Sequence, residues 1–331
     1  MKNINTNKSK QNQEEKILDC FFKKQQKGEK FTREELIFLY GFQGKNDKEV
    51  ALAKKIILNR DIKKDYAIIL ELSEENIATK LSDFEENRKI LAFLGDLDME
   101  FSSTSLPNFS NLKMIFGNAR FICLTSDLHL DSLQFIGKNA IFYSLTTSYG
   151  LSALEYIGGN AYFPNLQDAS SLGRLKQIDG DADFRSLENS FGLDSLEYVG
   201  GEAKFEKLTD ASFLKKLKQI GGNANFNSLK NSSGLSALEY IGENARFRKL
   251  LNASSLKNLK QIEGNADFRN LKDLEDLSNL KKIGGCGFFA SKVDLSLLND
   301  REIINGVIFI PNLKPQDQIT KPLVKQKKLE N

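Results

Sequence analysis

The sequence predicts an α/β solenoid whose stacked coils form a parallel β-sheet on the concave face, preceded by a small, mainly helical N-terminal domain. Two observations and one physical argument predict it. The pattern Ile-x-Gly-x-Ala-x-Phe recurs every 21 residues without insertion or deletion, and two rows of Leu recur at the same interval. A segment of this length cannot bury its apolar side chains alone, whereas stacked copies can. The copies begin at Ile115, Ile136, Ile157, Ile178, Val199, Ile220, Ile241, Ile262 and Ile283.

The chain before the repeats has a different composition. Residues 1–14 are mostly Asn, Lys and Gln, which predicts a disordered lead. Residues 15–99 predict a mainly helical domain, which either caps the first coil or acts as a separate docking or effector domain. Within it, Thr32 and Glu35 match a capping box, and the amphipathic segment 47–60 predicts a helix. The apolar run 65–72, DYAIILEL, fits a strand.

Each coil has two predicted parts. The Ala-x-Phe segment has the period of two that is typical of a strand. The Leu-x-x-Leu-x-x-Ile segment has a spacing of three and predicts a short helical or 3₁₀ stretch. About ten such coils fill residues 100–311, where Ile304 falls in the same register, and Leu94 is read as a degenerate opening copy. The Lys-rich segment 312–331 predicts a flexible basic tail.

A second period of 42 residues overlies the first. Leu-Glu-Tyr alternates with Leu-Lys-Gln from one coil to the next, so the duplicated unit was two coils. Acidic and basic residues such as Glu155 and Lys176 therefore become neighbours on stacked coils. We expect a solvated ladder of opposite charges, in which each pair contributes only about 0.2–1 kcal/mol.

The repeat L-x-x-L-x-x-I-G-G-x-A-x-F resembles the leucine-rich repeats of bacterial proteins and, more loosely, the repeats of receptor L domains. It departs from the commonest form because Ala and Phe stand where Leu-x-Leu is usual. The resemblance implies binding of a macromolecule through the concave sheet.

Composition excludes several classes of function. Basic residues exceed acidic ones by only 3, so no nucleic-acid partner is expected. No signal peptide is visible and the longest apolar run, 66–70, is too short for membrane insertion. Three separated cysteines, Cys20, Cys123 and Cys286, suit a reducing compartment. We expect a cytoplasmic protein, or one exported without a classical signal peptide, with a monomer favoured.

Candidate chemistry is sparse. Cys123 and His129 lack the third residue that would orient a Cys–His pair. Asp181, Asp183 and Glu202 offer oxygen ligands, but their spacing matches no known calcium loop. No phosphate-binding loop, nucleophile elbow or zinc motif is present. The sequence therefore predicts no catalytic residues, no cofactor and no metal.

Two positions of each strand change from coil to coil. One is the residue between Ala and Phe, and the other is the residue directly after Phe. Apolar and aromatic residues gather in early coils and basic residues in later ones, which predicts a strip that binds a protein partner of unknown identity, with tyrosines as anchors. The predicted contacts are Ile122, Ile141, Tyr143, Tyr162, Arg185, Lys204, Arg246, Arg248 and Arg269.

Three classes of function remain open. The first is a non-catalytic interaction module, including a secreted bacterial effector whose 15–99 domain carries the activity or docking. The second is an enzyme with its site in 15–99, and the third is a structural or surface protein. Free drift of a solvated face, or coverage of the aromatic residues by the N-terminal domain, would also explain the strip.

Overall fold

The computed structural model describes residues 3–41, 47–87, 89–99, 107–122, 129–271, 273–290 and 303–310. The chain divides into two compact units, Met1–Thr79 and Lys80–Asn331. The predicted tail, 312–331, lies outside the described residues. None of the described helices is both long enough and apolar enough to cross a membrane.

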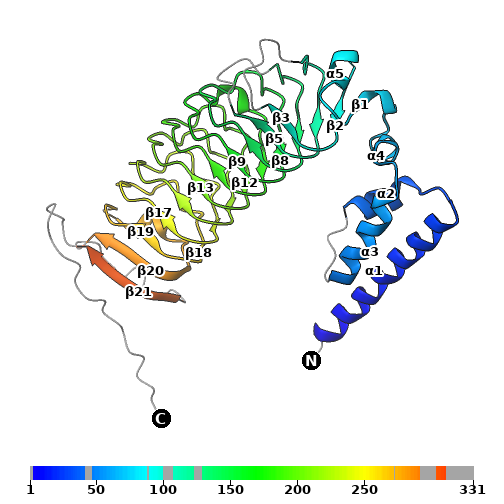
Figure 1. Ribbon diagram of the computed structural model, residues 1–331. Helices are drawn as coiled ribbons and strands as arrows, with labels where there is room; N and C mark the ends of the chain where they lie inside the picture. Colours follow the sequence, from blue (N-terminus) through cyan, green and yellow to red (C-terminus); the bar gives the residue numbers. More distant parts are fainter. Residues whose placement is uncertain are drawn as a thin grey trace. The chain divides into compact units, whose positions relative to one another are not determined.

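The first unit is built from helices (Figure 1). Its elements are α1 (Asn3–Gln26), α2 (Arg33–Tyr40), α3 (Asp47–Leu58), α4 (Ile62–Leu70), the 3₁₀ helix η1 (Glu74–Asn76) and β1 (Ile77–Ala78). Helix α1 begins within the segment for which composition predicts disorder. The unit has a core of its own, formed by Leu18, Phe21, Phe31, Leu36, Leu39, Ala53 and Ile56.

The ends of two helices follow from their capping residues. The capping box at α2 is confirmed, since the Thr32 side chain accepts from the Glu35 backbone and the Glu35 side chain accepts from the Thr32 backbone. The strand expected at 65–72 is wrong, because residues up to Leu70 belong to α4. The side chain of Asp61 caps this helix by accepting from the Lys64 N–H.

A buried carboxylate joins α2 to α4. Asp65 is 3% exposed and accepts from the Tyr40 hydroxyl at 2.8 Å and from two nitrogens of Arg60. Burial, together with the hydrogen bond to Asp65, raises the pKa of the Tyr40 hydroxyl. Both oxygens of Asp65 are thus engaged in holding the unit together.

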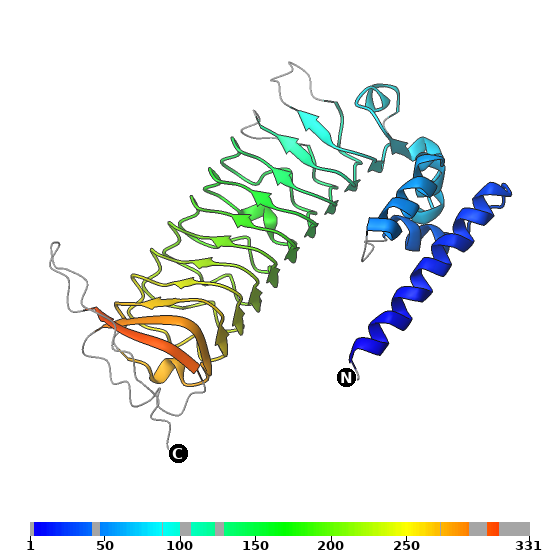
Figure 2. The ribbon, with the colours of Figure 1, turned by 60° about the horizontal axis from the view of Figure 1, so that its bottom comes forward.

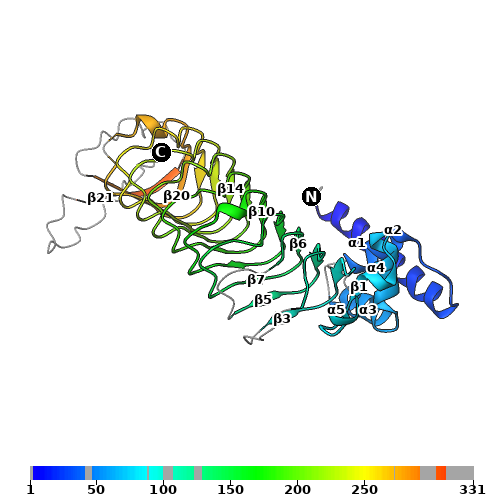
Figure 3. The same cartoon turned by 90° about the horizontal axis from the view of Figure 1, so that it is seen from above.

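The second unit is a parallel β-solenoid with two ladders of short strands, which follow different edges of the stack (Figures 2 and 3). It opens with α5 (Asp83–Glu86). The first ladder contains β2 (Ala92–Phe93), β4 (Met114–Ile115), β6 (Phe135–Ile136), β8 (Tyr156–Ile157), β10 (Gln177–Ile178), β12 (Tyr198–Val199), β14 (Gln219–Ile220), β16 (Tyr240–Ile241) and β18 (Gln261–Ile262).

The second ladder carries the Ala-x-Phe segments. It contains β3 (Leu97–Met99), β5 (Ala119–Phe121), β7 (Ala140–Ile141), β9 (Ala161–Tyr162), β11 (Ala182–Asp183), β13 (Ala203–Lys204), β15 (Ala224–Asn225), β17 (Ala245–Arg246) and β19 (Ala266–Phe268). The long strand β20 (Lys282–Ala290) continues both ladders. It pairs in parallel with β21 (Ile303–Ile310).

The register of the ladders equals the sequence repeat. Ala182 pairs with Ala203, 21 residues later, and the expected position of Ile304 is confirmed because it pairs with Ile283. The opening copy differs from the prediction. Phe93, not Leu94, pairs with Ile115, so the first coil is one residue longer than the repeat of 21 residues.

The Leu-x-x-Leu-x-x-Ile segments are less helical than predicted. Among the described coils, 3₁₀ helices occur only at η2 (Ser170–Leu172) and η3 (Glu275–Leu277). Elsewhere the spacing of three arises from single turns, as where Leu154 N–H donates to the Leu151 carbonyl at 3.1 Å. The Ile that ends each segment lies in a strand of the first ladder. This ladder was not predicted from the sequence.

The solenoid core is a continuous column of Phe rings. The column consists of the Phe residues that recur every 21 positions from Phe121 to Phe289. Each of these rings is fully buried, and successive ring centroids lie between 5.0 and 6.1 Å apart. Such offset stacking adds to the free energy gained by burial. At the opening end, Phe84 of α5 packs edge-on against Phe109 at 4.9 Å and stacks on Phe93. Helix α5 therefore covers the exposed end of the column.

A ladder of polar side chains links successive coils by hydrogen bonds to the backbone. The Asn139 side-chain oxygen accepts from the Asn160 N–H at 2.8 Å, and Asn160 repeats this bond to Asp181 at 2.7 Å. Asp181 does the same for the Glu202 N–H at 2.7 Å. Each coil thereby satisfies a backbone donor of the next one.

Replacing Asn139 with alanine should lower the free energy of unfolding by about 1–3 kcal/mol, because the Asn160 N–H loses its acceptor in a partly buried turn. Urea denaturation followed by circular dichroism measures this. Asn139→Asp is the matched control, since Asp181 fills the equivalent position with the same bond. A loss of equal size in the aspartate variant would contradict the hydrogen-bond explanation.

The predicted charge ladder forms as separate pairs. Lys176 lies 2.6 Å from Glu155, Lys218 2.8 Å from Glu197, and Lys260 2.5 Å from Glu239. The hydrogen bond from Lys176, followed by its charge, lowers the pKa of the Glu155 carboxyl. All of these side chains are well exposed, so they contribute little to stability.

Candidate functional site

The candidate site is the outward face of the second ladder, named here the outer strip. The Ala and Phe of each strand are buried, so the residue between them and the residue after Phe point outward. The strip consists of Arg120, Ile122, Ile141, Tyr143, Tyr162, Pro164, Asp183, Arg185, Lys204, Glu206, Asn225, Asn227, Arg246, Arg248, Asp267, Arg269 and Phe288.

The early coils form an aromatic end. Tyr143 is 43% exposed, and its ring lies 6.1 Å from that of Tyr162 in the next coil. The Asn160 amide donates to the Tyr162 hydroxyl at 2.9 Å and fixes that ring. Ile122 and Ile141 are half-buried beside them. The structure thus brings the four predicted apolar contacts onto neighbouring coils.

In the middle of the strip, each basic residue has an acidic partner within the chain. Arg185 forms a two-nitrogen ion pair with Asp183, which is 4% exposed, and Lys204 lies 3.4 Å from Glu202. The hydrogen bonds to Asp183 raise the pKa of the Arg185 guanidinium. These two predicted contacts therefore already have acidic partners within the chain.

Two amides follow in the next coil. The side-chain oxygens of Asn225 and Asn227 are buried and have no hydrogen-bond partner among the described residues. The Asn225 nitrogen reaches Glu206 at 3.4 Å. Since buried polar atoms are normally satisfied, this part of the strip offers acceptors to a ligand or to water.

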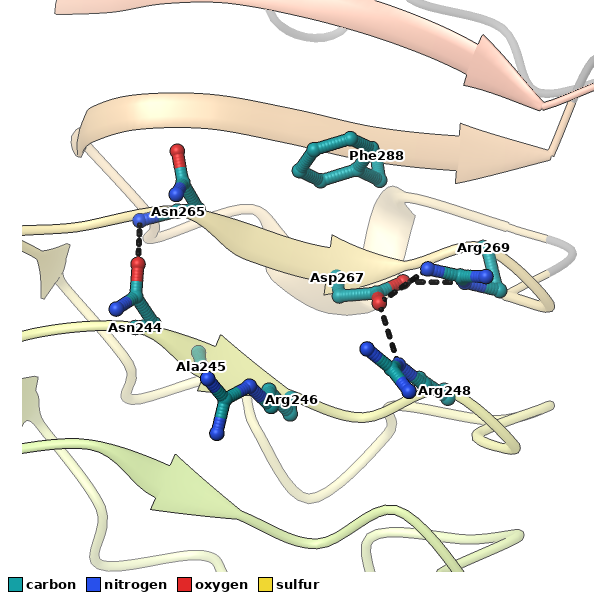
Figure 4. A pocket seen from close by; sticks show the side chains of 8 residues that line it. All are labelled: Asn244, Ala245, Arg246, Arg248, Asn265, Asp267, Arg269 and Phe288. Atoms are coloured by element: carbon teal, nitrogen blue, oxygen red, sulfur yellow. Dashed lines mark hydrogen bonds and ion pairs between the residues drawn. The ribbon is translucent and has the colours of Figure 1, made fainter. Parts of the chain in front are cut away.

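The later coils form a basic end with a cavity of about 220 Å³. Figure 4 shows Arg248 and Arg269 beside Asp267, Arg246 on the neighbouring strand with its guanidinium turned away from that carboxylate, and Phe288 above them. Arg248 donates to Asp267 at 3.0 Å, and Arg269 donates to both of its oxygens at 2.8 and 2.6 Å. These bonds raise the pKa of the Arg269 guanidinium. The three predicted basic contacts therefore surround one cavity.

The predicted contacts omit four polar or aromatic residues that line this cavity. They are Asp267, Phe288, Asn244 and Asn265. The sequence does contain a signal for Asp267, because Asp267 and Arg269 repeat the Asp-x-Arg spacing of Asp183 and Arg185. Residues two apart on a strand share a face, so the spacing alone indicates an ion pair.

The outward face of the first ladder is regular by comparison. Tyr and Gln alternate there from coil to coil, as at Tyr156, Gln177 and Tyr198. The Tyr156 ring stacks on Phe135 at 5.1 Å. Burial and a hydrogen bond to Asp179 raise the pKa of Tyr156 to about 12. This face repeats with the fold, whereas the outer strip changes in each coil.

The residues considered for metal or thiol chemistry have other roles or lie elsewhere. Asp181, Asp183 and Glu202 bond to the next coil, to Arg185 and to Lys204 respectively. Within the described ranges, no group of three or more His, Cys, Asp or Glu side chains is placed to hold a metal ion. His129 adopts a φ of 48°, and Cys123 lies outside the described residues.

Fold and repeat define the chain as a repeat protein of the parallel β-solenoid class, with coils of 21 residues. No model of a known protein family matches the chain, and no curated protein matches it either.

Proposed function

We propose that this protein is a non-catalytic interaction module that binds a protein partner through the outer strip. One observation carries the proposal: the buried rows are nearly identical in every coil, whereas the strip changes along the stack from aromatic to basic. Exposed Tyr143 and the adjoining Tyr162 ring supply large, stiff contact area. Tyr and Arg are the side chains most often found as anchors of interfaces.

The wider interpretation belongs to the same proposal. The Leu rows support a kinship with bacterial leucine-rich repeats, in which case the protein acts in the cytoplasm or after export without a classical signal peptide. The alternative function places docking or an effector activity in the first unit. It is favoured by that unit having a separate hydrophobic core.

The double variant Tyr143→Ala/Tyr162→Ala should weaken capture of the partner at least tenfold, because two anchors are lost together. The measurement is affinity capture with the full chain as bait, followed by a binding isotherm for the captured protein. Tyr149→Ala/Phe191→Ala is the matched control, since these aromatic residues are 60% and 51% exposed but lie outside the strip.

Each outcome has a defined meaning. Loss with the strip variant and retention with the control supports the proposal. Equal capture by both variants contradicts it and favours docking through the first unit. Loss with the control alone assigns binding to another face of the solenoid.

A further inference from the structure

The basic end of the outer strip carries positive charge that the chain does not balance. Three guanidinium groups and one carboxylate, that of Asp267, line the cavity, so two of its positive charges have no acid within the lining. The Arg246 side chain forms no hydrogen bond or ion pair with any residue that the structure describes. This contrasts with Arg185 and Lys204, each of which has its own acid.

The arginines are also held in place. Asp267 is 7% exposed and fixes the Arg248 and Arg269 side chains through three hydrogen bonds. Each guanidinium still has N–H donors to spare, because the group carries more donors than these bonds use. Side chains that are ordered before binding lose less conformational entropy when a ligand arrives.

The chemistry of the lining selects among anions. Guanidinium groups bind phosphate with paired hydrogen bonds. A phosphate monoester carries about −1.5 to −2 charges near neutral pH, which matches the two unbalanced positive charges better than one carboxylate does. Phe288 forms an apolar wall beside the arginines (Figure 4), and such a wall suits the organic part of an ester.

We propose that this cavity binds a phosphate monoester, with Arg246 and the Asp267-held pair Arg248 and Arg269 contacting the phosphate oxygens. The inference deepens the proposed function and rests on the outer strip being a binding surface. Its test needs no protein partner, so its failure and the failure of the tyrosine-anchor proposal are distinguishable.

The test is isothermal titration calorimetry of the full chain at low salt and pH 7.5. The probes are inorganic phosphate, a short phosphoserine peptide, its unphosphorylated form, acetate, and a single-stranded oligonucleotide. We expect both phosphate probes to bind, and the peptide to lose at least tenfold in affinity without its phosphate. Arg246→Gln should also reduce affinity for the phosphopeptide at least tenfold.

Lys249→Gln is the matched control, because it removes the same charge from the same coil without lining the cavity. It should change affinity less than twofold, and thermal denaturation checks that both variants stay folded. The proposal is overturned if acetate binds as tightly as phosphate, if neither phosphate probe binds, or if the two variants behave alike. Tighter binding of the oligonucleotide than of the phosphopeptide overturns it in favour of a nucleic-acid site.

Discussion

Replacing Phe205 with alanine should lower the free energy of unfolding by about 3–5 kcal/mol. The ring is fully buried and stacks between Phe184 at 5.6 Å and Phe226 at 5.3 Å. Its removal leaves a cavity bounded by two rings that the backbone ladders hold in place. Because whole domains are stable by only about 5–15 kcal/mol, the effect is a large share of the total.

Urea denaturation followed by circular dichroism measures the loss. Phe191→Ala removes the same atoms from a ring that is 51% exposed and packs edge-on against Phe213. We expect that variant to lose no more than about 1.5 kcal/mol. Similar losses for the two variants would show that the Phe column is not the main source of stability.

Gly192→Ala should cost about 2–5 kcal/mol, which is a large effect for the addition of one methyl group. Gly192 has a φ of 90°, and a Cβ there would lie 1.9 Å from the Ala169 carbonyl oxygen of the preceding coil. Alanine at this position is unfavourable for two reasons. Its φ is one that residues with a Cβ rarely adopt, and its Cβ would clash with backbone atoms of the preceding coil, which cannot move aside as a side chain can.

The control is Gly173→Ala, in a turn of the adjacent coil. Its φ is −60°, and beyond its two chain neighbours no heavy atom lies within 4 Å of an added Cβ. For this variant we expect the free energy of unfolding to stay the same or to rise by about 0.4–1 kcal/mol, because alanine lowers the conformational entropy of the unfolded chain. Melting temperatures of the two variants measure the contrast. If both variants melt alike, the close approach of the coils is not what requires glycine.

Much of the fold could be predicted, because the positions that keep the same apolar residue in every repeat are the positions that are buried. The Leu, Ala and Phe rows are the solenoid core, and the pairing of Glu155 with Lys176 followed from their spacing. The first ladder was missed because a spacing of three fits both a 3₁₀ helix and a succession of turns. Helix α4 was mistaken for a strand, since a short apolar run carries no clear period.

The candidate site was predictable in part. The sequence places Tyr143 and Tyr162 on neighbouring coils, and the structure confirms that their rings lie near one another. It cannot show that Arg248 reaches across to Asp267 of the next coil while Arg246 does not, because this depends on side-chain rotamers. The cavity is a product of those rotamers and of Phe288 on β20.

Coils with Leu-Glu-Tyr alternate with coils that have Leu-Lys-Gln, and buried side chains of one kind bond to the backbone of the other. This alternation limits how the solenoid can gain or lose coils. Ser148, Ser190 and Ser232 are buried, and each hydroxyl accepts a backbone N–H from the following coil. The equivalent buried residue of that following coil is Ala169, Ala211 or Ala253. Gain or loss of 42 residues preserves this alternation. Excision of a single coil would set Glu155 beside Glu197 and serine beside serine, so evolution of this stack is expected to proceed in even steps.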